Sequence, residues 1–199
     1  MKRRTFLIVM LAVFFLTRPV FGVEKEDARA KAVHAYVHEF VGDNVKESYP
    51  KIGQAIENVF MKLPDNVFRS LTDRSRPVIF VVNITAGIAK YANAVEFDIR
   101  PEDPPTFQKG FYLIKLGDDL EDLGDVVAIE GVVAHELAHR YLEHLKVPFS
   151  CDIERQANQQ AKDWGFGKEY LSAKETFGSK TPTDSPCHDH PAPKKETHE

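Results

Sequence analysis

The order of the predicted elements, with helices first, then short strands and then helices again, predicts an α+β domain. Helical spacing of apolar residues and short runs rich in β-branched residues are the two observations behind this prediction. The 199 residues fit one domain with a real core, and the hydrophobic content is ordinary for a soluble globular protein. The net charge of −4 includes no strong block of one sign, so the composition does not indicate a nucleic-acid partner.

The N-terminus has the three-part layout of a secretory signal peptide. Basic residues at positions 2–4 precede an apolar run over residues 6–16, and a small-residue site follows at residues 20–22. The apolar run is about half the length that a membrane-spanning helix needs. We therefore expect residues 1–22 to be a signal peptide cleaved after Gly22, with the mature protein periplasmic or extracellular. The alternative is an uncleaved anchor.

Two stretches near the expected mature N-terminus have the apolar spacing of helices. They span residues 24–41 and about 51–62. The apolar positions of the two stripes are Val33, Tyr36, Val37, Phe40 and Val41 in the first, and Ile52, Ile56, Val59 and Phe60 in the second.

Three strands are predicted in the middle of the chain. Residues 77–82 form a short apolar run rich in β-branched residues, typical of a buried strand. Ala94 to Ile99 alternates between apolar and polar residues, as a half-buried strand does, and Phe111 to Leu116 is a further strand. Thr85 to Tyr91 has the spacing of one short helical stretch.

The longest predicted helix runs from Asp125 to Leu145, before Pro148. A second helix is expected over residues 152–164, with Ser150 as a possible cap and Gly165 and Gly167 as its end. Lys168 to Phe177 is read as a last short helix. From Gly178 the chain turns polar and rich in proline, so we expect residues 178–199 to be a disordered tail.

The segment His135-Glu136-Leu137-Ala138-His139 has the pattern H-E-x-x-H on the longest predicted helix. Residues four apart lie on one helix face, so both imidazoles can bind the same metal ion. Glu136 lies beside them and can reach a water on that metal. Zinc needs a third protein ligand, which this segment does not supply.

Glu154 is the candidate for the third ligand. It opens the pattern E-x-x-A-N, which ends at Asn158, and a turn between the two helices would bring it back to the histidines. Asn158 lies one turn beyond Glu154 on the same face. Its side-chain oxygen could accept the free N–H of a ligand histidine. The alternative is an amphipathic helix with solvated histidines and a surface glutamate.

Cys151 and Cys187 are the only cysteines in the sequence. Export would permit a disulfide bond between them, and the alternative is two unpaired thiols. A disulfide would hold the tail close to the predicted metal site. His188 and His190 in that tail could bind a metal ion loosely, although solvated side chains are the simpler interpretation.

Together these motifs resemble the gluzincin metallopeptidases of the HtpX, BepA and CAAX-prenyl-protease kind. That family pairs H-E-x-x-H with a downstream E-x-x-A-D. The similarity extends to Asn93-Ala94, to the segment Gly110-Phe-Tyr-Leu-Ile-Lys-Leu-Gly-Asp, and to His144. It covers about residues 77–166, roughly half of the chain. The resemblance implies a zincin-like domain over residues 23–177, with a small mixed sheet and an active-site helix.

The sequence departs from the family pattern at two points. Asn158 stands where the family has an aspartate, and no spanning helix is expected after the signal peptide. The chain therefore looks like a small exported version of the family. The ImmA/IrrE type has a similar E-x-x-A-N pattern but works inside the cell, and the predicted signal peptide argues against that branch.

The resemblance implies a zinc-dependent endopeptidase that acts on unfolded or extended protein, in envelope quality control. One Zn²⁺ would be held by His135, His139 and Glu154, with Glu136 as general base. Substrate would add as a further strand along the edge of the sheet. That edge would be the strand Ala94–Ile99, with Asn93 and Ala94 at its start, or the strand Phe111–Leu116. The alternatives are a non-catalytic zinc protein that binds a partner and a scaffold that caps an envelope complex.

The residue that would stabilise the oxyanion is left open by the sequence. Tyr91, Arg140, Tyr141 and His144 are the candidates. On an ideal helix with 100° per residue, His144 lies about 160° from the midpoint of the two histidine ligands. We therefore do not predict it to be a ligand.

Overall fold

A computed structural model describes most of the chain. The described residues are 21–41, 43–83, 92–97, 109–148 and 150–178. Residues 1–20 of the expected signal peptide, the helical stretch expected at Thr85–Tyr91 and the expected tail from residue 179 lie outside them. No helix within the described ranges combines the length and the apolar character needed to cross a membrane.

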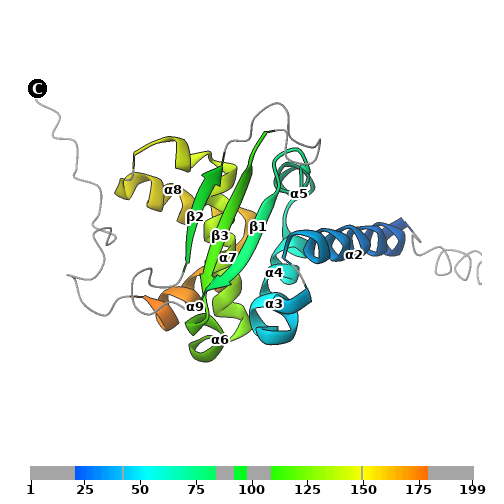
Figure 1. Ribbon diagram of the computed structural model, residues 1–199, viewed down its shortest axis with the longest axis horizontal. Coiled ribbons are helices and arrows are strands. Elements are labelled where there is room, and N and C mark those ends of the chain that lie inside the picture. Colours follow the sequence, from blue (N-terminus) through cyan, green and yellow to red (C-terminus); the bar gives the residue numbers. More distant parts are fainter. Residues whose placement is uncertain (1–20, 42, 84–91, 98–108, 149, 179–199) are drawn as a thin grey trace, which may run out of the picture.

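The described chain is mostly helical and contains one small sheet, an α+β arrangement as predicted (Figure 1). The elements are α2 (Phe21–Phe40), α3 (Asp43–Ser48), α4 (Pro50–Lys62), α5 (Asp65–Leu71), β1 (Val78–Asn83), β2 (Ala92–Phe97), β3 (Phe111–Gly117), α6 (Asp119–Leu123), α7 (Val126–Tyr141), the 3-10 turn η2 (His144–Lys146), α8 (Cys151–Ala161), the π-helical turn η3 (Lys162–Phe166) and α9 (Gly167–Phe177).

The sheet has the strand order β1-β3-β2. Strand β3 lies in the centre, parallel to β1 and antiparallel to β2, so that Ile114 stands opposite Phe80 on one side and Ala94 on the other. The expectation that Phe111–Leu116 could be a sheet edge is therefore wrong, because both sides of this strand are already hydrogen-bonded. In the described part of the chain, β2 forms an edge of the sheet.

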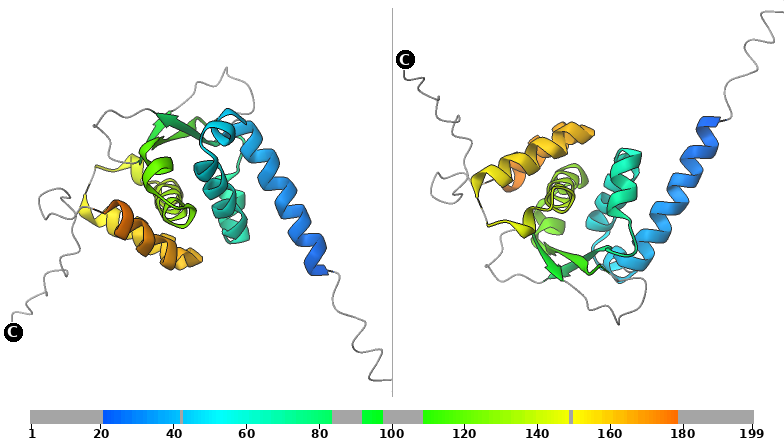
Figure 2. Two further views of the ribbon diagram at one scale, coloured as in Figure 1. Left: turned by 90° about the horizontal axis from the view of Figure 1, so that it is seen from below. Right: turned by 90° about the horizontal axis from the view of Figure 1, so that it is seen from above.

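The helices lie against one face of the sheet, as the two views of Figure 2 show. Alternate residues of β3 make this the core face, because Tyr112, Ile114 and Leu116 are fully buried while the residues between them are partly exposed. Helix α7 packs against α4, α8 and α9 and also contacts β2. The metal-motif helix is therefore the central helix of the layer.

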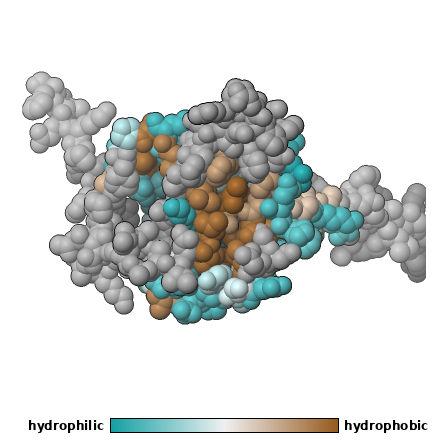
Figure 3. Space-filling model, viewed as in Figure 1, coloured by the Kyte–Doolittle hydropathy of each residue, from teal (hydrophilic) through white to brown (hydrophobic). Residues whose placement is uncertain are grey.

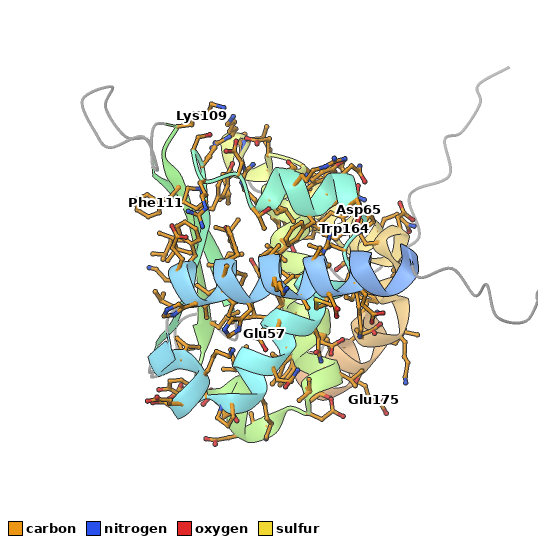
Figure 4. The ribbon with its side chains drawn as sticks, turned by 90° about the vertical axis from the view of Figure 1, so that its right-hand side faces the viewer. Glu57, Asp65, Lys109, Phe111, Trp164 and Glu175 are labelled. Carbon is orange, nitrogen blue, oxygen red and sulfur yellow. The ribbon has the colours of Figure 1, made fainter. Side chains whose placement is uncertain are left out.

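The opposite face of the sheet carries partly exposed apolar residues. Phe111 lies on this side, away from the helices (Figure 4). Ile79 of β1 and Leu113 of β3 are register partners and are both half-buried. Hydrophobic residues occupy the centre of the face in Figure 3.

The helical stripes predicted near the N-terminus are confirmed. The apolar positions predicted for the two stripes are all buried in α2, in α4 or directly after α2. Pro50 stands in the first turn of α4, where its missing N–H costs nothing. Helix α2 begins at Phe21, before the expected start at residue 24. Helices α3, α5 and α6 were not predicted, because each has only five to seven residues.

Helix α7 is shorter than predicted. It ends at Tyr141 rather than Leu145, and α2, with 20 residues, is the longest helix that the structure describes. Helix α7 starts where it was predicted to start, since the Asp125 side chain caps it by accepting a hydrogen bond from Ala128 N at 2.7 Å. Its end is set by Glu143, whose φ of 57° places a non-glycine residue in the left-handed region.

Ion pairs hold this left-handed turn in place. The Glu143 carboxylate accepts hydrogen bonds from Arg76 Nη1 at 3.1 Å, from Arg140 Nη1 at 2.6 Å and from the Tyr112 hydroxyl at 3.1 Å. Lys146 Nζ lies 2.7 Å from the same carboxylate. Both arginines also lie over the Tyr112 ring. Burial opposes ionisation, but these cations outweigh it and hold the pKa of Glu143 at about 2.

Replacing Glu143 by glutamine should lower the free energy of unfolding at neutral pH by about 1 kcal/mol. A pKa lowered from 4.5 to about 2 corresponds to about 3 kcal/mol for a fully buried group. The Glu143 side chain is 37 % exposed, and solvent screening reduces the effect. Because the folded-state pKa is depressed, the stabilisation is present above pH 4.5 and is lost as the pH falls toward 2.

Urea unfolding of both proteins in chelator, from neutral pH down to about pH 3, measures this difference. The difference in the free energy of unfolding between wild type and variant should become smaller below about pH 4.5. A gap that stays constant over this range would show that the carboxylate charge does not stabilise the turn.

The chain after η2 forms two helices joined by a kink. Ser150 occupies the N-cap position of α8, but its side chain makes no capping hydrogen bond. Gly165 breaks the helix with a φ of 98°, as predicted, whereas Gly167 is helical and begins α9. Trp164 and Phe166, on either side of the kink, are both buried in the core.

Candidate metal centre

His135 and His139 lie one turn apart on α7 and face Glu154 of α8. Their ligand atoms lie within 4.8 Å of one another. His135 Nε2 is 2.9 Å from His139 Nε2 and 3.2 Å from Glu154 Oε2, and His139 Nε2 is 3.5 Å from Glu154 Oε1. The predicted turn between the two helices thus brings the three predicted ligands together, in a group that could hold a metal ion.

The separations fit a tetrahedral zinc site. With bonds of about 2.1 Å, the ligand atoms of tetrahedral zinc stand about 3.4 Å apart. The three distances between the ligand atoms bracket this value. Two imidazole nitrogens and one carboxylate leave a fourth position open, which is the pattern of catalytic rather than structural zinc.

Asn158 fixes the tautomer of His135. Its Oδ1 atom lies 2.8 Å from His135 Nδ1. An amide oxygen only accepts hydrogen bonds, so His135 donates from Nδ1, and the neutral ring has its lone pair on Nε2. Asn158 thus makes the contact predicted for it with a ligand histidine.

His144 occupies the corresponding position behind His139. Its Nδ1 atom lies 3.0 Å from His139 Nδ1, and its Nε2 atom lies 3.1 Å from Gln156 Oε1. Burial lowers the pKa of His144, which favours the neutral ring. The metal-holding group found among the described residues consists of His135, His139 and Glu154.

The ideal-helix geometry placed His144 on the wrong face because it assumed that the helix continues. In the structure α7 ends at Tyr141, and the left-handed turn at Glu143 redirects the chain. His144 then returns toward the metal-ligand face. Neither its contact with His139 nor the role of Gln156 was predicted, and the spacing of residues carries no signal for either.

The electrostatics of the site favour a positive charge between the ligands. Burial would raise the pKa of the Glu154 carboxyl, but the hydrogen bonds and charges of His135 and His139 hold it well below its usual range. Burial alone would lower the pKa of His135, but the hydrogen bond that its ring donates to Glu154 and the nearby charge of Glu136 raise it. The negative charges that stabilise a protonated histidine here would also stabilise a cation bound between the ligands.

Glu136 is buried beside the ligand group. Its residue is 9 % exposed, and burial raises the pKa of its carboxyl, although the charges of His135 and His139 oppose this. A raised pKa makes a carboxylate a stronger proton acceptor, which suits a general base.

The described candidates for an oxyanion donor have other partners. Arg140 is held by Glu143 and lies over the Tyr112 ring. Tyr141 packs edge-on against Trp164, with ring centroids 5.4 Å apart. His144 is turned to His139, and Tyr91 lies outside the described residues.

Two further predicted features lie near the site. Cys151, the first residue of α8, is disulfide-bonded, while Cys187, its predicted partner, lies outside the described residues. Asn93 and Ala94 stand in β2, opposite Lys115 and Ile114 of β3. Strand β2 also contacts α7, the helix that carries the two histidines, and the turn η2 that follows it.

Comparisons with protein-family models, with curated proteins and with solved structures found no significant match.

Proposed function

We propose that the protein is a zinc-dependent endopeptidase of the gluzincin type with a zincin-like domain. The observation that carries the proposal is the convergence of His135, His139 and Glu154 at zinc-like separations, beside the buried carboxyl of Glu136. Three protein ligands, one open position and an adjacent base are the parts that metal-assisted peptide hydrolysis requires. Metal-assisted hydrolysis requires a carboxyl at this position, whereas a non-catalytic zinc protein does not.

The residues of the site take distinct roles in this proposal. His135, His139 and Glu154 would hold the ion, which when bound supplies the Lewis acidity that activates water and polarises a carbonyl. Glu136 accepts a proton from the attacking water and passes it to the leaving amine. Asn158 keeps the His135 Nε2 atom free of a proton and aimed at the ion.

An extended polypeptide fits the surroundings of this site. Strand β2 is a sheet edge among the described residues and contacts the metal-motif helix. A segment that pairs with it would offer its backbone to the centre in the extended form that unfolded proteins readily adopt. We therefore propose unfolded or extended protein as the substrate and, from the expected signal peptide, a role in quality control outside the cytoplasm.

Metal-dependent cleavage of casein by the purified protein tests the proposal. The zinc-loaded protein should degrade casein, a chelator such as 1,10-phenanthroline should abolish this activity, and added Zn²⁺ but not Mg²⁺ should restore it. Bound zinc is measured on the same samples. Protein that carries one zinc ion but cleaves nothing would favour the non-catalytic alternative, and cleavage that resists the chelator would exclude the metallopeptidase.

A further inference from the structure

Helix α8 supports both histidines of the metal centre, in addition to carrying Glu154. Asn158 contacts His135 directly, at 2.8 Å. Gln156 reaches His139 only through His144, by two contacts of 3.1 and 3.0 Å. The second support is therefore a chain of two side chains, neither of which belongs to the metal-holding group.

The Gln156 side chain, at one end of this series of hydrogen bonds, determines where the protons lie. The Gln156 Oε1 atom only accepts hydrogen bonds, so the proton in that contact belongs to His144 Nε2. A neutral His144 then has a lone pair on Nδ1, which can accept from the Nδ1–H of His139. With its proton on Nδ1, His139 presents an unprotonated Nε2 to the other ligands.

We propose that His144 and Gln156 are positioning residues that select the metal-binding tautomer and ring orientation of His139. The inference rests on the proposed metal site, but not on catalysis. The geometry suits the role, because His144 is 5 % exposed and its ring meets that of His139 edge-on, with centroids 5.1 Å apart. The left-handed turn at Glu143 places His144 there.

Without the acceptor on His144, the His139 ring loses this constraint. Its proton can then move to Nε2, where it blocks the metal, or the ring can turn about its bond to the backbone. Removal of such a supporting group typically weakens metal binding about 10- to 100-fold.

The test compares His144→Leu with His144→Asn in the full chain. Leucine has no acceptor, whereas asparagine places its Oδ1 atom close to the position of the imidazole Nδ1. We expect the zinc dissociation constant, measured by competition with a chromophoric chelator, to rise about 10- to 100-fold for His144→Leu. His144→Asn should stay within a few-fold of wild type. The Co²⁺ absorption spectrum should change in the leucine variant and return toward wild type in the asparagine variant.

A second pair at Gln156 keeps the proposal testable if the buried His144→Leu variant fails to fold. Gln156 is exposed, so its substitution leaves the core intact. Gln156→Met removes the accepting oxygen and should weaken zinc binding several-fold, whereas Gln156→Glu retains an acceptor and should bind at least as tightly as wild type. Thermal unfolding in chelator shows that each variant is folded.

The proposal is overturned if Gln156→Met, and His144→Leu where it folds, bind zinc as wild type does. It is also overturned if His144→Asn is as weak as His144→Leu, because packing rather than hydrogen bonding would then be responsible. These outcomes are read from metal affinity alone. A wild-type protein that binds zinc but does not cleave casein would overturn the peptidase and leave the positioning pair standing, whereas one that binds no zinc would overturn both.

Discussion

Replacing Glu136 by glutamine is expected to leave the zinc content unchanged and to lower the rate of casein cleavage by at least about 100-fold. Glutamine has the shape of glutamate but cannot accept and release a proton at neutral pH. The substitution should not damage the fold, because burial already raises the pKa of this carboxyl and a neutral group suits the position. Initial rates and zinc content of the two purified proteins, measured side by side, check the prediction.

A matched control for Glu136→Gln is Asn58→Asp, a change of similar size outside the metal-holding group. Among the described residues the Asn58 side chain of α4 accepts a hydrogen bond from Gln54 and donates one to Glu130 at 2.6 Å, and neither partner belongs to the metal-holding group. It should affect stability rather than cleavage in the folded protein. If Glu136→Gln cleaves casein at the wild-type rate while holding zinc, another residue is the base or the site is not catalytic.

Replacing Gly131 by alanine should destabilise the fold by about 3 kcal/mol and lower the melting temperature by about 10 °C. Gly131 lies in α7, one turn before the first histidine ligand, where the backbone of α9 comes close. A Cβ atom there would stand 2.2 Å from the Glu169 carbonyl oxygen and 2.8 Å from the Ala173 Cβ atom. Neither contact is with the end of a flexible side chain, so the helices must move apart. Calorimetry in chelator measures the change without a contribution from bound metal.

Gly167→Ala is the control for the intrinsic effect of alanine in a helix. Gly167 has helical backbone angles, and a Cβ atom there would meet nothing within 4 Å. The change should stabilise the protein by about 0.5 to 1 kcal/mol. Equal effects of the two substitutions would mean that α7 and α9 do not pack as closely as the structure places them.

The parts of the fold that were predicted are those with a local cause. The stripe that includes Ile52 and Ile56 repeats with helical period, and the apolar run before Asn83 is rich in β-branched residues. This run was predicted to be a buried strand, but of residues 78–82 only Val78 and Phe80 are buried, because β1 covers the helices with one face. Strand order depends on pairing between distant segments, which the sequence of one strand does not express. For this reason the central place of β3 was missed, and Phe111–Leu116 was wrongly considered as an edge.

The site shows the same division. His135 and His139 follow from helical spacing, and the turn at Pro148 is enough to bring Glu154 near them. The support of His139 depends on a left-handed residue at Glu143, which is stable because Arg76, from the segment before β1, and Arg140, from the end of α7, donate to its carboxylate. No local sequence pattern predicts such a turn, so the contacts of His144 and Gln156 behind His139 could be found only from the structure.

Helix α8 has a consequence for how the protein responds to the supply of metal. It buries only Ala157 and Ala161, yet it carries Glu154, Gln156 and Asn158. A segment with so little apolar contact opens locally at a small free-energy cost, and a bound ion ties it to α7. By mass action, each tenfold rise in free zinc above the dissociation constant adds about 1.4 kcal/mol to the cost of that opening. Zinc concentration would therefore set the resistance of this segment to unfolding, and to attack by other proteases, as well as the occupancy of the centre.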